Sequence, residues 1–308
     1  MKWLIIRNPN AAGGKSMRLW PSIREKLLSE GLDFEDVCTS KPMEAIDLTR
    51  EAIAKGYRKI AAMGGDGTVN EVVNGIMSQS YCDSKEILFT QIPIGTGNDW
   101  SRTMGIPKNF KALAHFMKSA GEDYQDIGLL SWKNSKGKEL QRYFVNIAGM
   151  GFDAFVGVIA NKSKAEGKSG VLSYIKALLS GLYQYKVQSV NLRVDSQNKG
   201  SFDLFSLAVG ICNYSGGGMK QCPDASYNDG ILDLTLIEKI NKWKVVFNIP
   251  GLYSGSFVKN REVHQFRGQY IEIKANENTL LEVDGEVIGS GTAEFSLLPS
   301  VLKILVGK

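Results

Sequence analysis

The sequence holds few of the residues that build zinc or disulfide sites. Its only histidines are His115 and His264, and its four cysteines lie far apart without a CxxC pair. A zinc site is therefore not expected. No apolar run reaches the roughly 18 residues that a membrane span needs, and the first residues, MKWLIIRNPN, have too short an apolar core for a secretion signal. These absences predict a cytoplasmic protein with reduced thiols, and they leave open a membrane-bound substrate reached from the cytoplasmic side.

The charge of the chain is nearly balanced. With 37 basic and 32 acidic residues among 308, the net charge of +5 is too small and too dispersed to indicate nucleic-acid binding. It suits an anionic ligand or surface. Hydrophobic residues make up 43% of the chain and charged residues 22%, which argues against extended disorder. The length favours two domains, and the sequence leaves a homodimer open.

Strands and helices alternate in the first 130 residues. Apolar runs predict strands at 2–7, 33–38, 59–63 and 87–94, and helical periodicity predicts helices at 19–31, 43–56 and 69–77. This alternation is typical of a parallel sheet covered by helices. In such sheets ligands bind beyond the carboxyl ends of the strands.

From about residue 129 the pattern changes to short alternating runs broken by turn residues. These runs cover 143–152, 190–196, 203–211, 231–238, 270–277, 279–287 and 293–298. They are typical of an antiparallel sandwich or barrel, which helices at 170–185 and 241–257 interrupt. The sequence therefore predicts an α/β N-terminal domain with a parallel sheet, residues 1–128, and an antiparallel β-sandwich domain, residues 129–298. The cleft between them is the expected active site.

Three loops rich in glycine or asparagine follow the expected strands: NPNAAGGKS at 8–16, GGDGT at 64–68 and GTGND at 95–99. One such turn is ordinary geometry, but three at one sheet edge indicate a ligand site. The first loop nearly matches the phosphate-binding pattern GxxxxGK[ST], except that Pro9, which has no N–H to donate, stands at the first glycine. Lys15 remains either a cation for phosphate or a solvated lysine after a turn.

The acids in these loops need an explanation. In GGDGT the glycines admit a ligand, and the helix expected from Val69 offers free N–H groups to phosphate. Because a carboxylate repels phosphate unless a cation lies between them, Asp66 suggests a nucleotide–magnesium complex. Thr68 and Glu71 also have the spacing of a capping box, a structural use of both. Asp99 is a second acid, and Asp126 is either a third or a turn residue.

The order and spacing of several motifs resemble those of the diacylglycerol kinase-like lipid kinases, specifically the soluble bacterial branch. These motifs are NPNAAGGK, GGDGTVNEV, PIGTGNDW, RYFVNIAGMGFDA, SYNDGILDL and EVDGE. GGDGT is shared with related ATP- and NAD-phosphorylating folds, whereas the NDG and VDGE segments are specific to the lipid branch. The resemblance implies an ATP-binding catalytic domain of the NAD kinase/diacylglycerol kinase type, to which a last strand at about 299–308 returns, and a lipid-substrate domain.

The resemblance also implies roles for individual residues. The expected nucleotide-binding residues are Asn10, Thr39, Gly65, Asp66, Gly67, Thr68, Val69, Asn70, Glu71 and Thr96, with Lys15 as a cation for the ATP phosphates. Asp66, Asp99 and Asp126 match the acidic cluster around a catalytic Mg²⁺. Glu286 matches the general base; without the resemblance it is a hairpin acid after a DG turn. The resemblance also implies a structural Mg²⁺ bound by the backbone of Ser226, the carboxylate of Asp229 and the backbone of Ile231. Ser226 stands where the family commonly has a more apolar residue.

The expected activity is transfer of the γ-phosphate of ATP, with Mg²⁺, to a lipid hydroxyl, first of all that of diacylglycerol to give phosphatidic acid. The alternatives are another lipid alcohol (a sphingoid base or phosphatidylglycerol), a soluble substrate as in the NAD kinases, and a nucleotide- or lipid-binding regulator without turnover. Two basic segments suit peripheral contact with the inner face of the membrane, around Lys162, Lys164 and Lys168 and around Lys242, Trp243 and Lys244. Core packing of the apolar faces beside them is an equal alternative.

Overall fold

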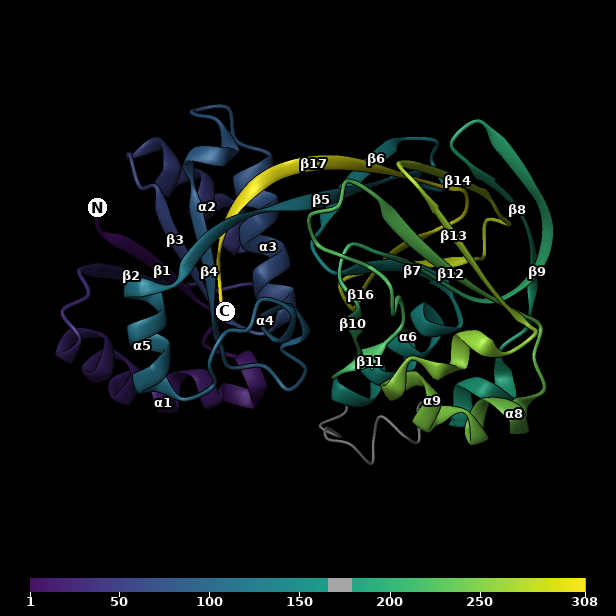
Figure 1. The fold of residues 1–308 in the computed structure, drawn as a ribbon, viewed down its shortest axis with the longest axis horizontal. Helices are drawn as coiled ribbons and strands as arrows, with labels where there is room; N and C mark the ends of the chain where they lie inside the picture. Colours follow the sequence, from purple (N-terminus) through teal and green to yellow (C-terminus); the bar gives the residue numbers. More distant parts are fainter. Residues whose placement is uncertain (166–178, 308) are drawn as a thin grey trace.

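The computed structural model describes residues 1–165 and 179–307; for residues 160–165 it describes the backbone only. Figure 1 shows an α/β part and a β-rich part side by side, joined by two long strands, β5 and β17. The fold class expected from the sequence is confirmed: the strands of the first part are parallel and those of the second are antiparallel.

A parallel sheet in the order β2-β1-β3-β4 forms the N-terminal part. Its strands are β1 (Trp3–Arg7), β2 (Phe34–Cys38), β3 (Lys59–Gly64) and β4 (Leu88–Pro93). Its helices are α1 (Ala11–Ser29), α2 (Glu44–Ala54), α3 (Asp66–Met77), α4 (Asp99–Thr103) and α5 (Phe110–Ser119), with a short 3₁₀ turn at Ser84–Glu86. β1, β3 and β4 are buried along nearly their whole length, which explains why each one appears in the sequence as a continuous apolar run.

Two helices begin earlier than predicted. α1 includes Ala12, Gly13 and Gly14 in left-handed conformations, so the regular helix starts near Lys15 instead of residue 19. α3 starts at Asp66 instead of Val69, with Gly65 as its N-cap and no side-chain cap bond. The capping box expected at Thr68 and Glu71 therefore does not form. The Glu71 carboxylate instead accepts a hydrogen bond from the Ala45 N–H in the first turn of α2, at 3.3 Å.

Several elements were not predicted from the sequence. Among them are α4, α5, α6 and β13. α5 has a clear signal in hindsight, because the Asn109 side chain caps it by accepting hydrogen bonds from the Lys111 and Ala112 N–H groups. The single helix expected at 241–257 is instead α8 (Lys242–Phe247), α9 (Ile249–Ser254) and a 3₁₀ turn. Pro250 lies in the first turn of α9, where its missing N–H is tolerated.

β5 (Gly121–Lys133) and β17 (Ala293–Val306) run through both parts of the molecule (Figure 1). They pair with each other in antiparallel fashion. The last residues of β17 also pair in parallel with β4, through Lys303 opposite Leu88 and Ile304 opposite Phe89. β5 is unbroken across residues 128 and 129, where the sequence suggested a domain boundary, so the two parts share these strands.

The C-terminal part is built from antiparallel strands around β9, which pairs with β7, β8 and β12. Its strands are β6 (Glu139–Phe144), β7 (Ile147–Gly151), β8 (Gln188–Val194), β9 (Gln197–Gly210), β10 (Tyr214–Ser215), β11 (Met219–Lys220), β12 (Leu232–Glu238), β13 (Val263–Gly268), β14 (Tyr270–Lys274), β15 (Leu280–Val283) and β16 (Glu286–Ser290). Its helices include α6 (Phe152–Ala165), α8 and α9, with a 3₁₀ turn at Ser256–Lys259. Of the helix predicted at 170–185, residues 179–184 are helical and residues 170–178 lie outside the described residues.

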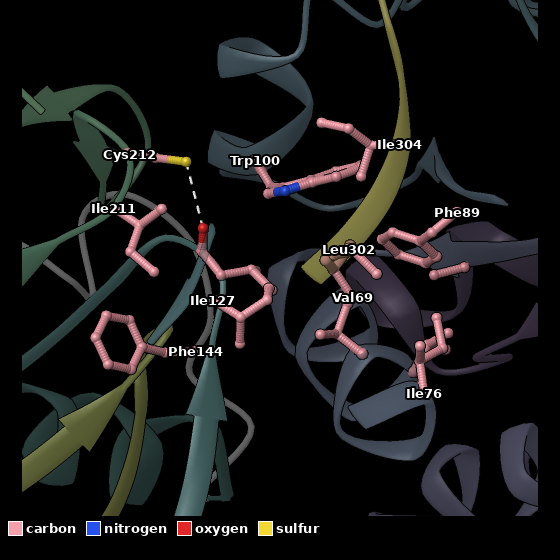
Figure 2. Close-up of a cluster of buried hydrophobic side chains, with 14 of the residues drawn as sticks. Val69, Ile76, Phe89, Trp100, Ile127, Phe144, Ile211, Cys212, Leu302 and Ile304 are labelled. Carbon is pink, nitrogen blue, oxygen red and sulfur yellow. Dashed lines mark hydrogen bonds between the residues drawn. The ribbon is translucent and has the colours of Figure 1, made fainter. Parts of the chain in front are cut away.

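One hydrophobic core continues from the first part into the second. Figure 2 shows Phe89 and Ile304 on one side of it and Phe144 and Ile211 on the other, with Ile127 of β5 in between. All of these side chains are fully buried. The shared core and the shared strands hold the two parts together, so a site between them has fixed walls.

Candidate active site

The three loops predicted to meet at the sheet edge do meet. Gly65 and Gly95 pack backbone against backbone: a Cβ on Gly95 would lie 2.6 Å from the Gly65 Cα. The first loop joins them through Asn8, whose side-chain amide donates a hydrogen bond to the Thr68 hydroxyl at 3.3 Å. Sequence reasoning missed Asn8. Its signal lies in the same NPN motif, where it directly follows β1 and its carboxamide accepts a hydrogen bond from the Asn10 N–H.

The first loop has the form of an open turn with an exposed cation. Ala12, Gly13 and Gly14 all have φ between 51° and 81°, a run that glycine tolerates and other residues rarely adopt. Lys15 follows directly, and both it and Asn10 are exposed to solvent. The loop therefore presents an ammonium group beside the sheet edge, as a phosphate ligand requires.

Asp66 and Asp99 converge on Gly97. A Cβ placed on Gly97 would lie 3.1 Å from one Asp66 oxygen and 3.2 Å from one Asp99 oxygen. The other Asp66 oxygen accepts a hydrogen bond from the Trp100 N–H at 3.1 Å, and Asp99 accepts one from the Gly217 N–H at 2.7 Å. The two carboxylates thus come from different loops and share the space above one glycine.

The Asp99 carboxylate has an unsatisfied oxygen. The residue is only 4% exposed, and its Oδ1 has no hydrogen-bond partner within the described part of the chain. The Arg102 guanidinium lies 3.7 Å away. Burial raises the pKa of Asp99, and the nearby Asp66 carboxylate raises it further, against the opposing effect of the Gly217 N–H. The unsatisfied Oδ1 is the oxygen near Arg102, whereas Oδ2 is the oxygen above Gly97 that shares this space with Asp66. Two carboxylates that share one small space repel each other, which favours a bound cation between them.

Asp66 and Asp99 fit the way in which nucleotide-binding enzymes usually hold Mg²⁺. Mg²⁺ is usually held by one or two carboxylates together with substrate phosphates rather than by a complete protein cage. Over residues 1–165 and 179–307 no group of three or more His, Cys, Asp or Glu side chains converges as a metal site. Asp66 and Asp99 would therefore hold Mg²⁺ only together with the phosphates of ATP.

Asp126 occupies a structural junction. It is fully buried, and its two oxygens accept hydrogen bonds from the Gly230 and Ser300 N–H groups, both at 2.7 Å. Burial raises the pKa of this carboxyl, and the two N–H groups oppose the shift. Asp126 thus ties β5 to β17 and to the loop at 226–231, whereas the pair above Gly97 consists of Asp66 and Asp99.

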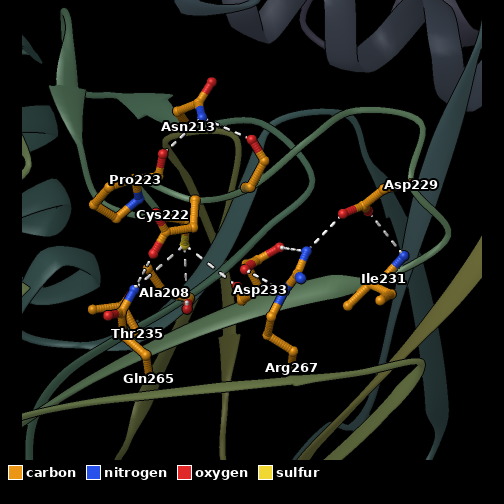
Figure 3. Close-up of polar contacts among 12 residues, drawn as sticks. Ala208, Asn213, Cys222, Pro223, Asp229, Ile231, Asp233, Thr235, Gln265 and Arg267 are labelled. Atoms are coloured by element: carbon orange, nitrogen blue, oxygen red, sulfur yellow. Dashed lines mark hydrogen bonds and ion pairs between the residues drawn. The ribbon is translucent and has the colours of Figure 1, made fainter.

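The residues expected to hold a structural magnesium make contacts within the protein. Figure 3 shows the Asp229 carboxylate paired with Arg267, at 2.6 Å, while its other oxygen accepts a hydrogen bond from the Ile231 N–H. The Ser226 hydroxyl donates to Asn228 at 3.4 Å. Arg267 also pairs with Asp233 at 2.9 Å, so two carboxylates share one guanidinium. The magnesium site at Ser226, Asp229 and Ile231 stays a prediction, and we derive no step through a second metal.

Glu286, at the start of β16, lies above the GGDGT loop. A Cβ on Gly67 would come within 2.9 Å of its Oε1. The side chain is 42% exposed, and its other oxygen lies 3.6 Å from an Arg142 nitrogen. Burial raises the pKa of Glu286; Arg142 lowers it, and Glu71 and Asp284 raise it. A carboxylate from the second part of the chain is thus placed over the expected phosphate-binding loop of the first.

A buried polar network holds Glu286 in this position. Asp284 accepts hydrogen bonds from three backbone N–H groups, those of residues 145–147, and from the Asn70 side chain at 2.7 Å. Asn70 in turn accepts one from Arg142 at 2.8 Å. Burial raises the pKa of Asp284 to about 6. The sequence reasoning missed Asp284 and Arg142 as residues that line this site, although each stands in a motif already noted, VDGE and RYF.

The other residues expected to bind nucleotide fall into two groups. Gly65, Gly67 and Thr96 lie at the surface of the loops. Val69 lies in the hydrophobic core, and the Asn70 side chain is hydrogen-bonded within the polar network described above. Thr39 is buried, and its N–H and hydroxyl both donate hydrogen bonds to the Arg7 carbonyl. Contacts between a nucleotide and the side chains of the second group would therefore require rearrangement, while the first group can contact a ligand directly.

An apolar pocket lies behind α6, in the β-rich part. Its walls come from α6, β9, β12 and the α8–α9 segment, with Phe152, Val156, Phe205, Ile237, Ile249 and Leu252 among the lining residues. One end is polar: the Asp153 carboxylate accepts hydrogen bonds from Ser206 at 2.6 Å and Gln221 at 3.2 Å. Burial raises the pKa of Asp153. α6 also packs on β16, where a Cβ on Gly157 would lie 3.1 Å from Val287. The pocket was not predicted because α6 was not.

The expected membrane surface is described only in part. The side chains of Lys162 and Lys164, and all of Lys168, lie outside the described residues, whereas Lys242, Trp243 and Lys244 are part of α8. In the described ranges, no helix is both long enough and apolar enough to span a membrane.

Comparison with known proteins gives two family matches that together cover most of the chain. Residues 2–129 match the family described as "Diacylglycerol kinase catalytic domain", and residues 146–306 match "YegS C-terminal NAD kinase beta sandwich-like domain". A diacylglycerol kinase of Mycobacterium tuberculosis is 27% identical over 301 residues, which cover 97% of this chain and 93% of that protein. A diacylglycerol kinase of Bacillus subtilis is 27% identical over 313 residues, with 99% and 96% covered.

Solved structures agree on the fold. The crystal structure of a diacylglycerol kinase from Bacillus anthracis has a TM-score of 0.71 at 21% identity, and the match covers 99% of this chain and 97% of that one. Yeast NADH kinase complexed with NADH has a TM-score of 0.55 at 12% identity, with 100% and 84% covered. At these identities the likeness shows the fold alone.

Proposed function

Because the chain belongs to the diacylglycerol kinase-like lipid kinases, we propose that it transfers the γ-phosphate of ATP to a lipid hydroxyl, and that diacylglycerol is the acceptor. The observation that carries this proposal is the position of Glu286. A carboxylate from the β-rich part stands 2.9 Å from where a Cβ on Gly67 would be, over the loop expected to hold the phosphates. Donor and acceptor chemistry therefore meet at one point between the two parts.

The residues of the chain divide the work of phosphoryl transfer. The exposed Lys15 and the N-terminus of α3 attract the phosphates. Asp66 and Asp99 would hold the Mg²⁺ that, when bound with ATP, neutralises charge on the transferring group. Glu286 accepts the proton of the lipid hydroxyl as the new P–O bond forms, which typically contributes about 10²–10⁴-fold. A raised pKa makes this carboxylate a stronger base than a glutamate with the ordinary pKa.

The apolar pocket supports a lipid rather than a soluble acceptor. Its lining of phenylalanine, isoleucine, valine and leucine suits acyl chains. Its polar end, at Asp153, suits the hydroxyl or ester groups of a lipid backbone. α6 lines this pocket and also contacts β16, the strand that begins with Glu286, so the proposed lipid pocket and the proposed base are built on neighbouring elements. The soluble-substrate alternative rests on a shared fold alone.

One labelling experiment tests the proposal. The pure protein is incubated with Mg²⁺ and γ-labelled ATP against diacylglycerol, a sphingoid base, phosphatidylglycerol and NAD. Wild type should label an organic-extractable product from diacylglycerol. Glu286→Gln should lower the rate by about 10²–10⁴-fold, and Asp66→Asn should also lower it strongly. Glu139→Gln serves as the matched control, because Glu139 is a solvent-exposed acid on β6 that forms a surface ion pair with Lys133.

Each outcome has a defined meaning. Label found only in NAD refutes the lipid kinase. Label found only in the sphingoid base or in phosphatidylglycerol keeps the lipid kinase and replaces the acceptor. Full activity in Glu286→Gln keeps the kinase and removes the proposed base.

A further inference from the structure

The α8–α9 segment exposes aromatic side chains on its outer side. Trp243 is 73% exposed and Phe247 is 79% exposed, and their i,i+4 spacing puts them on one face of α8. Tyr253 of α9 is also exposed. Tyr183 joins them, because Lys242 lies 5.4 Å over its ring and donates a hydrogen bond to its carbonyl. We call Tyr183, Trp243, Phe247 and Tyr253 the aromatic patch. Large apolar groups gathered on a surface mark an interaction site.

The inner side of the same two helices lines the apolar pocket. Val245 of α8 and Ile249 and Leu252 of α9 are among its wall residues. Figure 1 shows α8 and α9 together at the edge of the β-rich part. The segment therefore has apolar side chains on both sides, one set toward the pocket and one toward the outside. A wall that faced only water would carry polar residues on its outer side.

The positive charge of the α8–α9 segment indicates that its partner is anionic. Residues 239–261 contain four lysines, one arginine and no acidic residue. Lys244 is neutralised by Glu262 at 2.6 Å, whereas Lys239, Lys242 and Lys259 are exposed. Aromatic side chains flanked by lysines are the combination that binds the interface of an anionic membrane, where the rings enter the headgroup region and the ammonium groups meet lipid phosphates.

We propose that the aromatic patch is the surface on which the protein docks to anionic membranes, and that docking places the wall of the apolar pocket against the bilayer. Lipid chains then reach the pocket without crossing water. The purpose of this surface rests on the proposed lipid kinase function, but vesicle binding needs neither ATP nor turnover, so the two proposals can fail separately.

Trp243 provides a local reporter for the test. Of the five tryptophans, Trp3, Trp100 and Trp132 are buried and Trp20 is partly buried, which leaves Trp243 as the exposed one. The full chain is mixed with vesicles of phosphatidylcholine and phosphatidylglycerol, without ATP. We expect its emission to shift to shorter wavelength and to be quenched when the lipids carry brominated acyl chains. Vesicles of phosphatidylcholine alone, or high salt, should reduce binding.

Vesicle sedimentation of variants completes the test. The double variant Trp243→Ala, Phe247→Ala should bind roughly tenfold more weakly or worse, and Lys242→Gln should bind severalfold more weakly. Tyr81→Ala is the control, since Tyr81 is an exposed aromatic residue of the N-terminal part and should leave binding unchanged. Thermal unfolding midpoints confirm that the variants are folded.

The outcomes separate the possibilities. Equal sedimentation of the double variant and wild type, or bound protein whose tryptophan emission is not quenched, overturns the docking proposal. Phosphorylation of a dissolved short-chain diacylglycerol by a protein that binds no vesicles overturns docking and keeps the kinase. Quenching without any lipid labelling keeps docking and overturns the kinase. If the protein forms a dimer without vesicles and the double variant does not, the aromatic patch binds a second copy of the chain. That result refutes the membrane-docking proposal.

Discussion

Gly97→Ala tests whether Asp66 and Asp99 work as a pair. The backbone of Gly97 is outside the left-handed region, so alanine causes no conformational strain. Its new methyl group would lie 3.1 Å from an Asp66 oxygen, 3.2 Å from an Asp99 oxygen and 3.6 Å from the Gly217 nitrogen. The first two distances are shorter than ordinary carbon–oxygen contacts, so the carboxylates must move apart by a few tenths of an ångström. The methyl group would also occupy space that an ion between them needs.

The expected effect is on activity rather than on stability. Misplacement of reacting groups on this scale costs about 10–100-fold in rate, whereas a methyl group in a loop changes the free energy of unfolding by about 1 kcal/mol or less. We expect kcat/KM to fall within that range and the Mg²⁺ concentration for half-maximal rate to rise. The assay is initial rate against Mg²⁺ at saturating ATP, with urea unfolding alongside it.

Gly121→Ala is the matched control. Gly121 also has no positive φ, and at the start of β5 a new methyl group would meet nothing closer than 3.9 Å. It should keep wild-type rates. The reasoning is refuted if Gly97→Ala keeps both the wild-type kcat/KM and the wild-type Mg²⁺ dependence, because the two carboxylates would then not share an ion.

Three further predictions concern charged groups. Glu286 has a pKa raised by burial above its ordinary 4.5, and a base acts when deprotonated, so kcat/KM should rise with pH through that raised pKa and then level; the same rise in Glu286→Gln would contradict this. Asp284 has a pKa of about 6 in the fold against an ordinary 3.8, so the folded state binds its proton more tightly, and its contribution to stability, complete below 3.8, is lost as pH rises to about 6. Asp284→Asn should remove this slope in urea unfolding measured on both sides of the window, and an unchanged slope would assign it to another group. Arg267→Gln leaves the buried Asp233 without its cation and should lower the free energy of unfolding by about 2–3 kcal/mol; a variant as stable as wild type would show that the pair adds nothing.

The sequence predicted best where one physical pattern decides the structure. β1, β3 and β4 are buried on both faces, so their apolar runs identified them, and the rule for parallel strands then brought Asp66 and Asp99 to one edge. The position of Glu286 could not be predicted in this way. It depends on the pairing of β15 with β16 and on bonds from Arg142 and Asn70, which are 144 and 216 residues away along the chain from Glu286.

α6 shows why the pocket escaped prediction and why it matters. The run predicted from the sequence ended at residue 152, and no element was assigned to the residues after it. In the structure, β7 ends at Gly151, whose φ is 96°, and α6 begins directly at Phe152. As a helix, it carries Phe152 and Val156 toward the pocket and Gly157 toward Val287 of β16. Glycine at that point lets the helix approach the strand that begins with Glu286. In the proposed reaction, α6 would thus contact the chains of the lipid through Phe152 and Val156 and pack through Gly157 on β16, the strand that begins with Glu286.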